Sequence, residues 1–137
     1  MCLYIDKKIH GPFQRIKKAK EDIVCYKVLR DYGDHLYTPY IFSEVSSQVY
    51  KGELPMVGEC SNIRKLFRRI FHSNEIGEGY IHIFRLQSWA QGEAHFLTSQ
   101  KESVSLFKCI IPKGTYYYQG KYGDYASECI IFKECLI

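Results

Sequence analysis

The chain has 137 residues and lacks the short motifs that usually identify catalytic or metal-binding proteins. Its six cysteines include no pair in the C-x-x-C spacing that is typical of zinc ligands and of thiol–disulfide exchange. No P-loop, HExxH sequence, EF-hand loop or recognisable nucleophile triad is present. The sequence therefore predicts no cofactor and no metal, and it favours a binding protein over an enzyme without deciding between them.

Long hydrophobic runs are missing as well. No stretch approaches the roughly 20 apolar residues that a membrane-spanning helix requires. The first eight residues, MCLYIDKK, lack the apolar core of a secretory signal. These absences predict a cytoplasmic protein without a membrane partner, in which the cysteines stay reduced.

Aromatic residues, by contrast, are abundant: they make up 15% of the chain and include 12 tyrosines and 8 phenylalanines. This content favours strands. The clearest strand patterns are Ile23–Leu29, Tyr80–Phe84, Phe107–Ile111 and Cys129–Phe132. Helical patterns occur at Ser61–Phe71 and, less regularly, at Leu86–His95. We expect one α+β domain over residues 1–137, with a single mixed or mostly antiparallel sheet of about five to seven strands and about two helices.

Basic residues gather in two segments, although the net charge is only +4. Lys7–Lys20 contains six lysines and arginines and no acidic residue, and a second basic group lies at Arg64–Arg69. We expect residues 1–21 to form a mobile basic segment. Such groups either form a solvated face or attract phosphate. With so small a net charge, a phosphate-bearing small molecule is a better candidate partner than nucleic acid.

The region between the last two predicted strands holds five tyrosines in ten residues, at positions 116, 117, 118, 122 and 125. One interpretation is a strand with half-buried tyrosines and a polar turn. The other is an aromatic wall for a flat ligand, formed by Tyr116, Tyr118 and Tyr125 with Lys121 neutralising phosphate. Strand alternation places Tyr116 and Tyr118 on one face and Tyr117 on the other. We expect Tyr117 to be the core residue of the three.

Further candidate ligand-binding residues lie in or near the predicted strands. His82 alternates with isoleucines and is either a core residue or a hydrogen-bond donor to a ligand. Arg30 and Arg85 each follow an apolar strand, where functional sites often lie. Glu128 precedes the last strand and is either an exposed charge or a carboxylate that binds ribose hydroxyls. Trp89, the only tryptophan, is expected in the core.

Several short motifs occur in a recognisable order. They are Tyr26–Leu29 (YKVL), Leu36–Pro39 (LYTP), Gly79–Phe84 (GYIHIF), Ile111–Pro112 (IP) and Ala126–Ile130 (ASECI). This order resembles a small uncharacterised domain, common in phage and bacterial genomes, that often adjoins pentapeptide repeats. The chain departs from the pattern in having Thr38 where serine is usual and an extra Tyr80, and it has no pentapeptide repeats. The resemblance implies a phage or prophage source, and hence the cytosol of a host cell.

A second resemblance concerns ADP-ribosyltransferases. Ile111–Thr115 (IPKGT) is similar to a strand start in those enzymes, and Ser127–Glu128 is similar to their glutamate-bearing segment. The resemblance implies an NAD-using enzyme, with Glu128 as the catalytic carboxylate and Arg30 as the strand arginine that holds NAD. The Ser-Thr-Ser or tyrosine element of that family has no convincing match.

Three functions therefore compete. The leading hypothesis is a non-enzymatic phage protein that binds a nucleotide-derived signal molecule and sequesters it from a bacterial immune system. The second is an interaction or inhibitor module that docks on a host or phage protein, and the third is the NAD-using enzyme. A homo-oligomer is compatible with any of them. A pocket lined by tyrosine and arginine favours the first hypothesis, and a flat aromatic patch favours the second.

Overall fold

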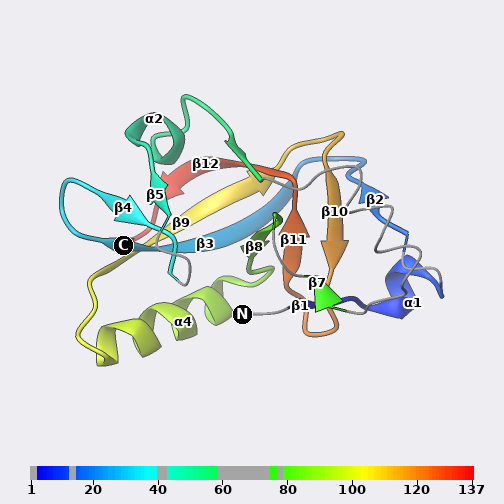
Figure 1. Cartoon of the computed structure of the whole chain (residues 1–137), viewed down its shortest axis with the longest axis horizontal. Helices are drawn as coiled ribbons and strands as arrows, with labels where there is room; N and C mark the ends of the chain where they lie inside the picture. The colour runs from blue at the N-terminus through cyan, green and yellow to red at the C-terminus, as the bar shows by residue number, and fades with distance from the viewer. Residues whose placement is uncertain (1–2, 13–14, 40–42, 59–74, 77–78) are drawn as a thin grey trace.

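Strands dominate the structure, a computed structural model that describes residues 3–12, 15–39, 43–58, 75–76 and 79–137. The predicted α+β class is confirmed (Figure 1). The strands form two main antiparallel sheets, where the sequence predicted one. The predicted helix at Ser61–Phe71 and the basic group within it lie outside the described residues. Within the described part, no helix has the length and apolarity needed to cross a bilayer.

The larger sheet has six strands and is built on the pairing of β3 (Ile23–Asp31) with β9 (Val104–Ile111). Their register runs without a break from Ile23 opposite Ile111 to Arg30 opposite Val104. The order across the sheet is β5 (Glu44–Val45), β4 (Leu36–Tyr37), β3, β9, β12 (Cys129–Cys135) and β6 (Met56–Val57). The long strands of this sheet contain three of the four strands predicted from the sequence.

The smaller sheet has four strands, in the order β2 (Lys17–Lys18), β10 (Tyr116–Gln119), β11 (Tyr125–Ser127) and β8 (Ile81–Ile83). A separate pair joins β1 (Leu3–Tyr4) to β7 (Glu75–Ile76). The two main sheets are linked by a bridge between Tyr26 and Phe84 and by Glu128, which lies between β11 and β12. One hydrophobic core can therefore extend from the large sheet to the small one.

Strand alternation in β3 and β9 divides the large sheet into two buried faces. Cys25, Leu29 and Phe107 belong to the main core, which also contains the side chain of Tyr125 from the small sheet. Val28 and Leu106 point the other way and pack against α4 (Gln87–Ser99). Figure 1 shows α4 and the short helix α2 (Ser47–Tyr50) on opposite sides of β3, β9 and β12.

The predicted helix at Leu86–His95 is confirmed and is longer than expected. It continues to Ser99, beyond the predicted end at His95. Gly92 lowers helix stability by about 1 kcal/mol relative to alanine. Packing of Ala90, Ala94 and Leu97 on the sheet compensates for that loss, since tertiary contacts supply most of the stability of short helices.

Candidate functional site

The tyrosines of β10 do not form the predicted ligand wall, because both faces of that strand are covered. Tyr118 is only 1% exposed and packs with Ile5 and Ala126 in a second hydrophobic cluster. Tyr117 packs against the main core and meets Tyr125 edge-on, with ring centroids 5.8 Å apart. Tyr117 is only partly buried, so the prediction that it is the core residue of the three was wrong: the fully buried ring is that of Tyr118. Tyr118 and Tyr125 are both buried rather than available to a ligand. Only Tyr116 of the β10 tyrosines is substantially exposed, at 39%.

The N-terminal segment is what covers Tyr118. The short helix α1 (Lys7–His10) places the buried His10 beside it, with ring centroids 5.3 Å apart. His10 Nε2 accepts a hydrogen bond from the Gln119 backbone N–H at 2.7 Å, and Nδ1 lies 2.8 Å from the Arg15 carbonyl oxygen. Burial lowers the pKa of His10, which favours the neutral imidazole that this arrangement needs. The basic segment that the sequence predicted to be mobile therefore contains a residue fixed to β10.

The other predicted ligand-binding residues are dispersed. His82 pairs with Ala126 in the small sheet, on the face that also carries Tyr118. Lys121 lies at the tip of the β10–β11 hairpin, where its backbone N–H bonds the Tyr4 carbonyl at 2.8 Å. Arg85 precedes α4 and lies against Gly123 of the same hairpin, whereas Arg30 lies in β3. None of these four side chains lines the pocket that opens on the large sheet.

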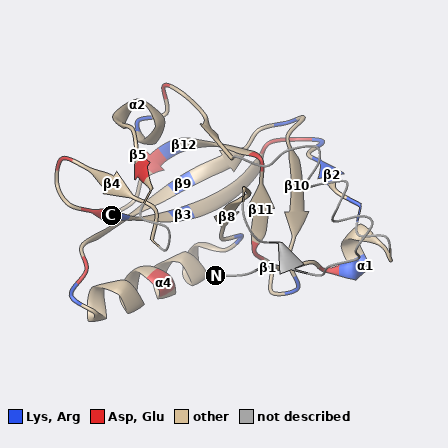
Figure 2. Ribbon diagram, in the orientation of Figure 1, with Lys and Arg blue, Asp and Glu red and all other residues tan. Residues whose placement is uncertain are grey.

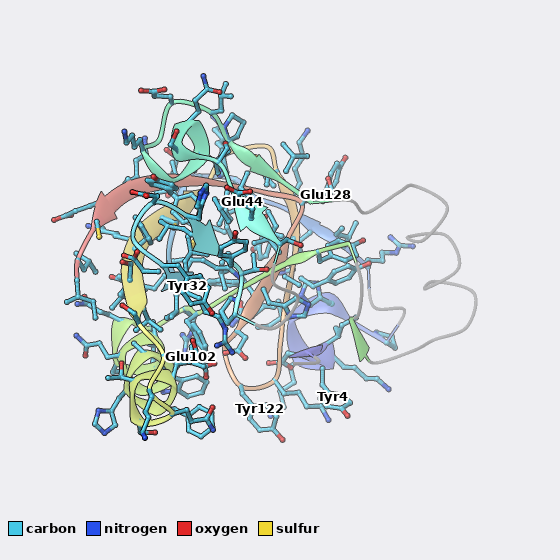
Figure 3. All side chains as sticks on the ribbon, turned by 60° about the vertical axis from the view of Figure 1, so that its left-hand side comes forward. Tyr4, Tyr32, Glu44, Glu102, Tyr122 and Glu128 are labelled. Carbon is cyan, nitrogen blue, oxygen red and sulfur yellow. The ribbon has the colours of Figure 1, made fainter. Side chains whose placement is uncertain are left out.

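Arg30 and Glu128 also fail to meet. The Arg30 guanidinium forms a 2.7 Å ion pair with Glu102 and donates to the Pro39 carbonyl at 2.8 Å. Glu128 borders the opposite end of the sheet, next to the strand that pairs with Ile110. About seven residues of extended strand, or roughly 23 Å, separate the two ends. Figure 3 shows Glu102 and Glu128 on opposite sides of the molecule. The geometry gives no support to an NAD site that uses both residues.

Helix α4 has an unusual distribution of apolar side chains. Its inward face carries the small residues Ala90 and Ala94, which are at most 3% exposed. The large residues Trp89 and Phe96 are 44% and 52% exposed, and Leu86 just before the helix is 41% exposed. Residues seven apart lie on the same side of a helix, so Trp89 and Phe96 form one apolar stripe. The expectation that Trp89 is a core residue was wrong.

The same helix carries almost no charge. Among its 13 residues, Glu93 is the only aspartate, glutamate, lysine or arginine, and Figure 2 shows a largely uncharged ribbon with one acidic segment. Glu93 lies between Trp89 and Phe96 in the i, i±3/4 positions that are neighbours on a helix surface. It is close enough to Asp124 to contribute, after burial, to the raised pKa of that carboxyl. The apolar stripe therefore borders the β10–β11 hairpin.

Exposed aromatic residues continue on that hairpin. Arg85 packs against the hairpin at Gly123, where an added Cβ would lie 2.9 Å from Nε. Tyr122 at the tip is 69% exposed and the adjoining Tyr4 is 48% exposed, and Figure 3 shows both rings pointing outward from the same end. We use the name aromatic surface for the exposed apolar side chains of α4, of the residue before it, of the hairpin and of the adjoining strand β1. Its members are Tyr4, Leu86, Trp89, Phe96 and Tyr122.

A lysine lies in the main core, on the face of β3 opposite α4. Lys27 is 8% exposed, and its Nζ donates to the His82 carbonyl oxygen at 2.7 Å. Burial lowers the pKa of Lys27 to about 8, against the opposing effects of Cys109, Cys25 and Glu93. Burial also raises the pKa of both cysteine thiols, that of Cys109 to about 12. Thiols in this state are poor nucleophiles, so the group has no evident covalent chemistry.

Two polar features lie elsewhere. A pocket of about 380 Å³ opens on the core face of the large sheet, and its lining includes Asp31, Ser105, Phe107 and Lys133. At the edge of the small sheet, Lys18 places Nζ 6.0 Å from the centre of the Tyr116 ring, next to Lys17. In the described residues, no group of three or more histidines, cysteines or acidic residues is arranged to hold a metal ion.

Comparison with known proteins adds no assignment: no protein-family model, curated protein or solved structure matches this chain. The resemblances to a phage domain and to ADP-ribosyltransferases therefore remain predictions from the sequence. Three features of the structure are candidate binding sites: the aromatic surface, the basic edge at Tyr116 and the pocket.

The buried Lys27 generates a prediction about pH. The unfolded chain binds this proton up to about pH 10.5 and the folded chain only up to about pH 8. Between these values Lys27 makes the free energy of unfolding rise with pH. A shift of this size corresponds to about 3 kcal/mol. The change in the free energy of unfolding caused by Lys27→Met should therefore be about 3 kcal/mol more stabilising at pH 7 than at pH 10.5. Urea unfolding of the variant and of wild type under reducing conditions measures this difference.

The matched control for this experiment is Lys108→Met, which removes a lysine from the adjacent strand β9. Tyr125, whose pKa is raised by burial, destabilises the fold at high pH, but it is present in every variant and cancels in the comparison. Parallel stability profiles for wild type and Lys27→Met would contradict the burial of a lysine with a lowered pKa.

Proposed function

We propose that this protein is a non-enzymatic interaction module that docks on a partner protein in the cytosol through the aromatic surface. The observation that carries the proposal is the exposure of two large aromatic residues on α4. The helix buries Ala90, Ala94 and Leu97 and leaves Trp89 and Phe96 about half exposed. A partner that covers these two rings gains the apolar burial that the fold itself leaves unused.

The composition of the surface fits a protein interface. Interface centres are depleted of charged residues and enriched in tryptophan, tyrosine, phenylalanine and arginine. Here Trp89 and Phe96 flank Glu93 at neighbouring positions of α4, and the exposed Tyr122 lies on the hairpin that Arg85 contacts at Gly123. Truncating a tryptophan or tyrosine at the centre of such an interface commonly costs 2 kcal/mol or more of binding free energy. We expect Trp89 to be the principal anchor.

The position of Glu93 favours a different protein over a second copy of this chain. An antiparallel pairing that places Trp89 of one copy over Phe96 of the other brings the two Glu93 side chains together at the centre. Like charges placed opposite each other in an interface cost several kcal/mol. We therefore expect the partner to be a different protein that presents an apolar ridge to Trp89 and Phe96.

A capture experiment tests this proposal. Tagged protein is expressed in the cell that produces it, and the captured proteins are compared for wild type, Trp89→Ala, Phe96→Ala and Gln91→Ala. Gln91 is exposed on the other flank of α4 and is the matched control. One protein should be captured by wild type and Gln91→Ala and lost with either aromatic variant. Thermal denaturation should show that the two aromatic variants remain folded, since both side chains are half exposed.

Two results would contradict the docking proposal. One is capture of the same partner by the Trp89→Ala, Phe96→Ala double variant at wild-type level. The other is a concentration-dependent dimer in analytical ultracentrifugation that Trp89→Ala abolishes, because the surface would then bind a second copy of the chain.

A second candidate is the sequestration of a nucleotide-derived signal, as the resemblance to a phage domain suggests. The observation that favours it is the basic edge of the small sheet, where Lys18 lies beside the exposed Tyr116 and the neighbouring Lys17 pairs with Tyr117. The ring offers a stacking platform worth about 1–3 kcal/mol for a base. The lysines offer charge for phosphate. This edge is open rather than enclosed, which makes tight sequestration harder to achieve than protein docking.

Titration with adenosine monophosphate, followed by NMR, tests the nucleotide candidate. Tyr116→Ala should weaken binding about 5- to 150-fold with little change in stability. Tyr118→Ala should instead destabilise the fold by about 3–5 kcal/mol, because that ring is buried. If Tyr116→Ala and Lys18→Gln both bind as wild type does, this edge is not a nucleotide site.

A further inference from the structure

The pocket on the core face of the large sheet has chemistry that neither proposed function uses. Its floor is apolar and is formed by Phe107, Leu36 and Tyr50. The rings of Tyr50 and Phe107 lie 6.4 Å apart between centroids. Its volume of about 380 Å³ is within the usual range for sites that bind small molecules. It lies on the side of the sheet opposite α4, and so it is separate from the aromatic surface.

One wall of the pocket carries a carboxylate in a fixed position. Asp31 Oδ2 accepts a hydrogen bond from Ser105 Oγ at 2.7 Å, and Oδ1 accepts one from the Gly33 backbone N–H at 2.8 Å. Each carboxylate oxygen has two acceptor positions, so each oxygen can take one further hydrogen bond. Asp31 is thus oriented by the protein and still able to bind a cationic group of a ligand.

The other wall carries two ammonium groups. Lys51 follows α2, and Lys133 lies at an irregularity in β12 where the register shifts between Phe132 and Glu134. Such bulges redirect side chains. In the described part of the chain, neither lysine forms an ion pair or a side-chain hydrogen bond. Both are therefore available to an anionic group.

A close backbone approach holds these two segments together. Gly52 has a φ of +83°, and a Cβ at this position would lie 2.5 Å from the Phe132 carbonyl oxygen. Only glycine fits this conformation and this distance without strain. The lysines on either side of the contact, Lys51 and Lys133, are consequently brought to the same pocket by the backbone itself.

We propose that this pocket binds a small zwitterion of the size of an amino acid or dipeptide, with an apolar side chain. The ammonium group of the ligand bonds Asp31, its carboxylate lies between Lys51 and Lys133, and its side chain covers Phe107 and Tyr50. Charges of both signs line the pocket, since Asp31 lies there with Lys51 and Lys133. A multiply charged phosphate ligand would be repelled by Asp31, whereas a zwitterion can bind both the carboxylate and the lysines.

NMR titration of the full chain with L-leucine and L-phenylalanine tests the proposal. Their N-acetylated amides, which carry no charge, serve as matched probes, and adenosine monophosphate serves as an anionic probe. The free amino acids should shift the backbone amides of Gly33 and Ser105, and the capped amides should not. Because a charge-assisted hydrogen bond is worth about 1.5–3 kcal/mol, Lys133→Gln and Lys51→Gln should each weaken binding about 10-fold or more.

Both lysines are exposed, so these variants should remain folded, and Lys101→Gln at the end of α4 is the control that should bind normally. Asp31→Asn should abolish the response, with a thermal melt to verify its fold. The proposal is overturned if no amino acid shifts these amides at about 10 mM. It is also overturned if the capped amides bind equally well, or if adenosine monophosphate alone binds there.

Discussion

The pairing of β3 with β9 is the constraint on which the remaining structure depends. Eight consecutive residue pairs fix the register from Ile23–Ile111 to Arg30–Val104. A slip of one residue would exchange the two faces of one strand relative to the other. If β9 kept its position, Lys27 would then face α4 and Val28 would face the main core. The observed register therefore decides at once which residues form the core, where α4 docks and where the pocket opens.

The two faces of this pairing lead to different kinds of site. On one face, Ala90, Ala94 and Leu97 pack α4 against the sheet, and Trp89 and Phe96 are left at the surface. On the other face, Asp31, Ser105 and Phe107 form part of an open pocket. One is an apolar surface suited to a protein, and the other is a small polar cavity suited to a compact ligand.

The elements that the sequence predicted correctly are those with a strong local pattern. Strands β3, β8, β9 and β12 follow from runs of β-branched and aromatic residues, and α4 follows from its helical spacing. The environment of each face could not be predicted in the same way. Alternation separates Tyr117 from Tyr118, but it does not show that α1, more than 100 residues earlier in the chain, covers Tyr118.

The candidate sites were harder still to predict. Helix α4 has two apolar sides, one with Ala90 and Ala94 and the other with Trp89 and Phe96. The sequence does not show which side packs against the sheet. The pocket combines residues from four separate segments, and the contact at Gly52 that joins two of them is visible only in three dimensions. The burial of Lys27 had one signal in the sequence. Lys27 lies among apolar residues in a strand pattern, where a charged side chain is an exception that calls for a structural reason.

Site-specific photo-crosslinking tests the docking claim most directly. A benzophenone amino acid is placed at position 96, within the aromatic surface, and separately at position 91 on the other flank of α4. Irradiation in the producing cell should give one crosslinked partner protein from position 96 and none from position 91. The absence of a crosslink at position 96, an equal yield at position 91, or a product that contains only this chain would contradict the account.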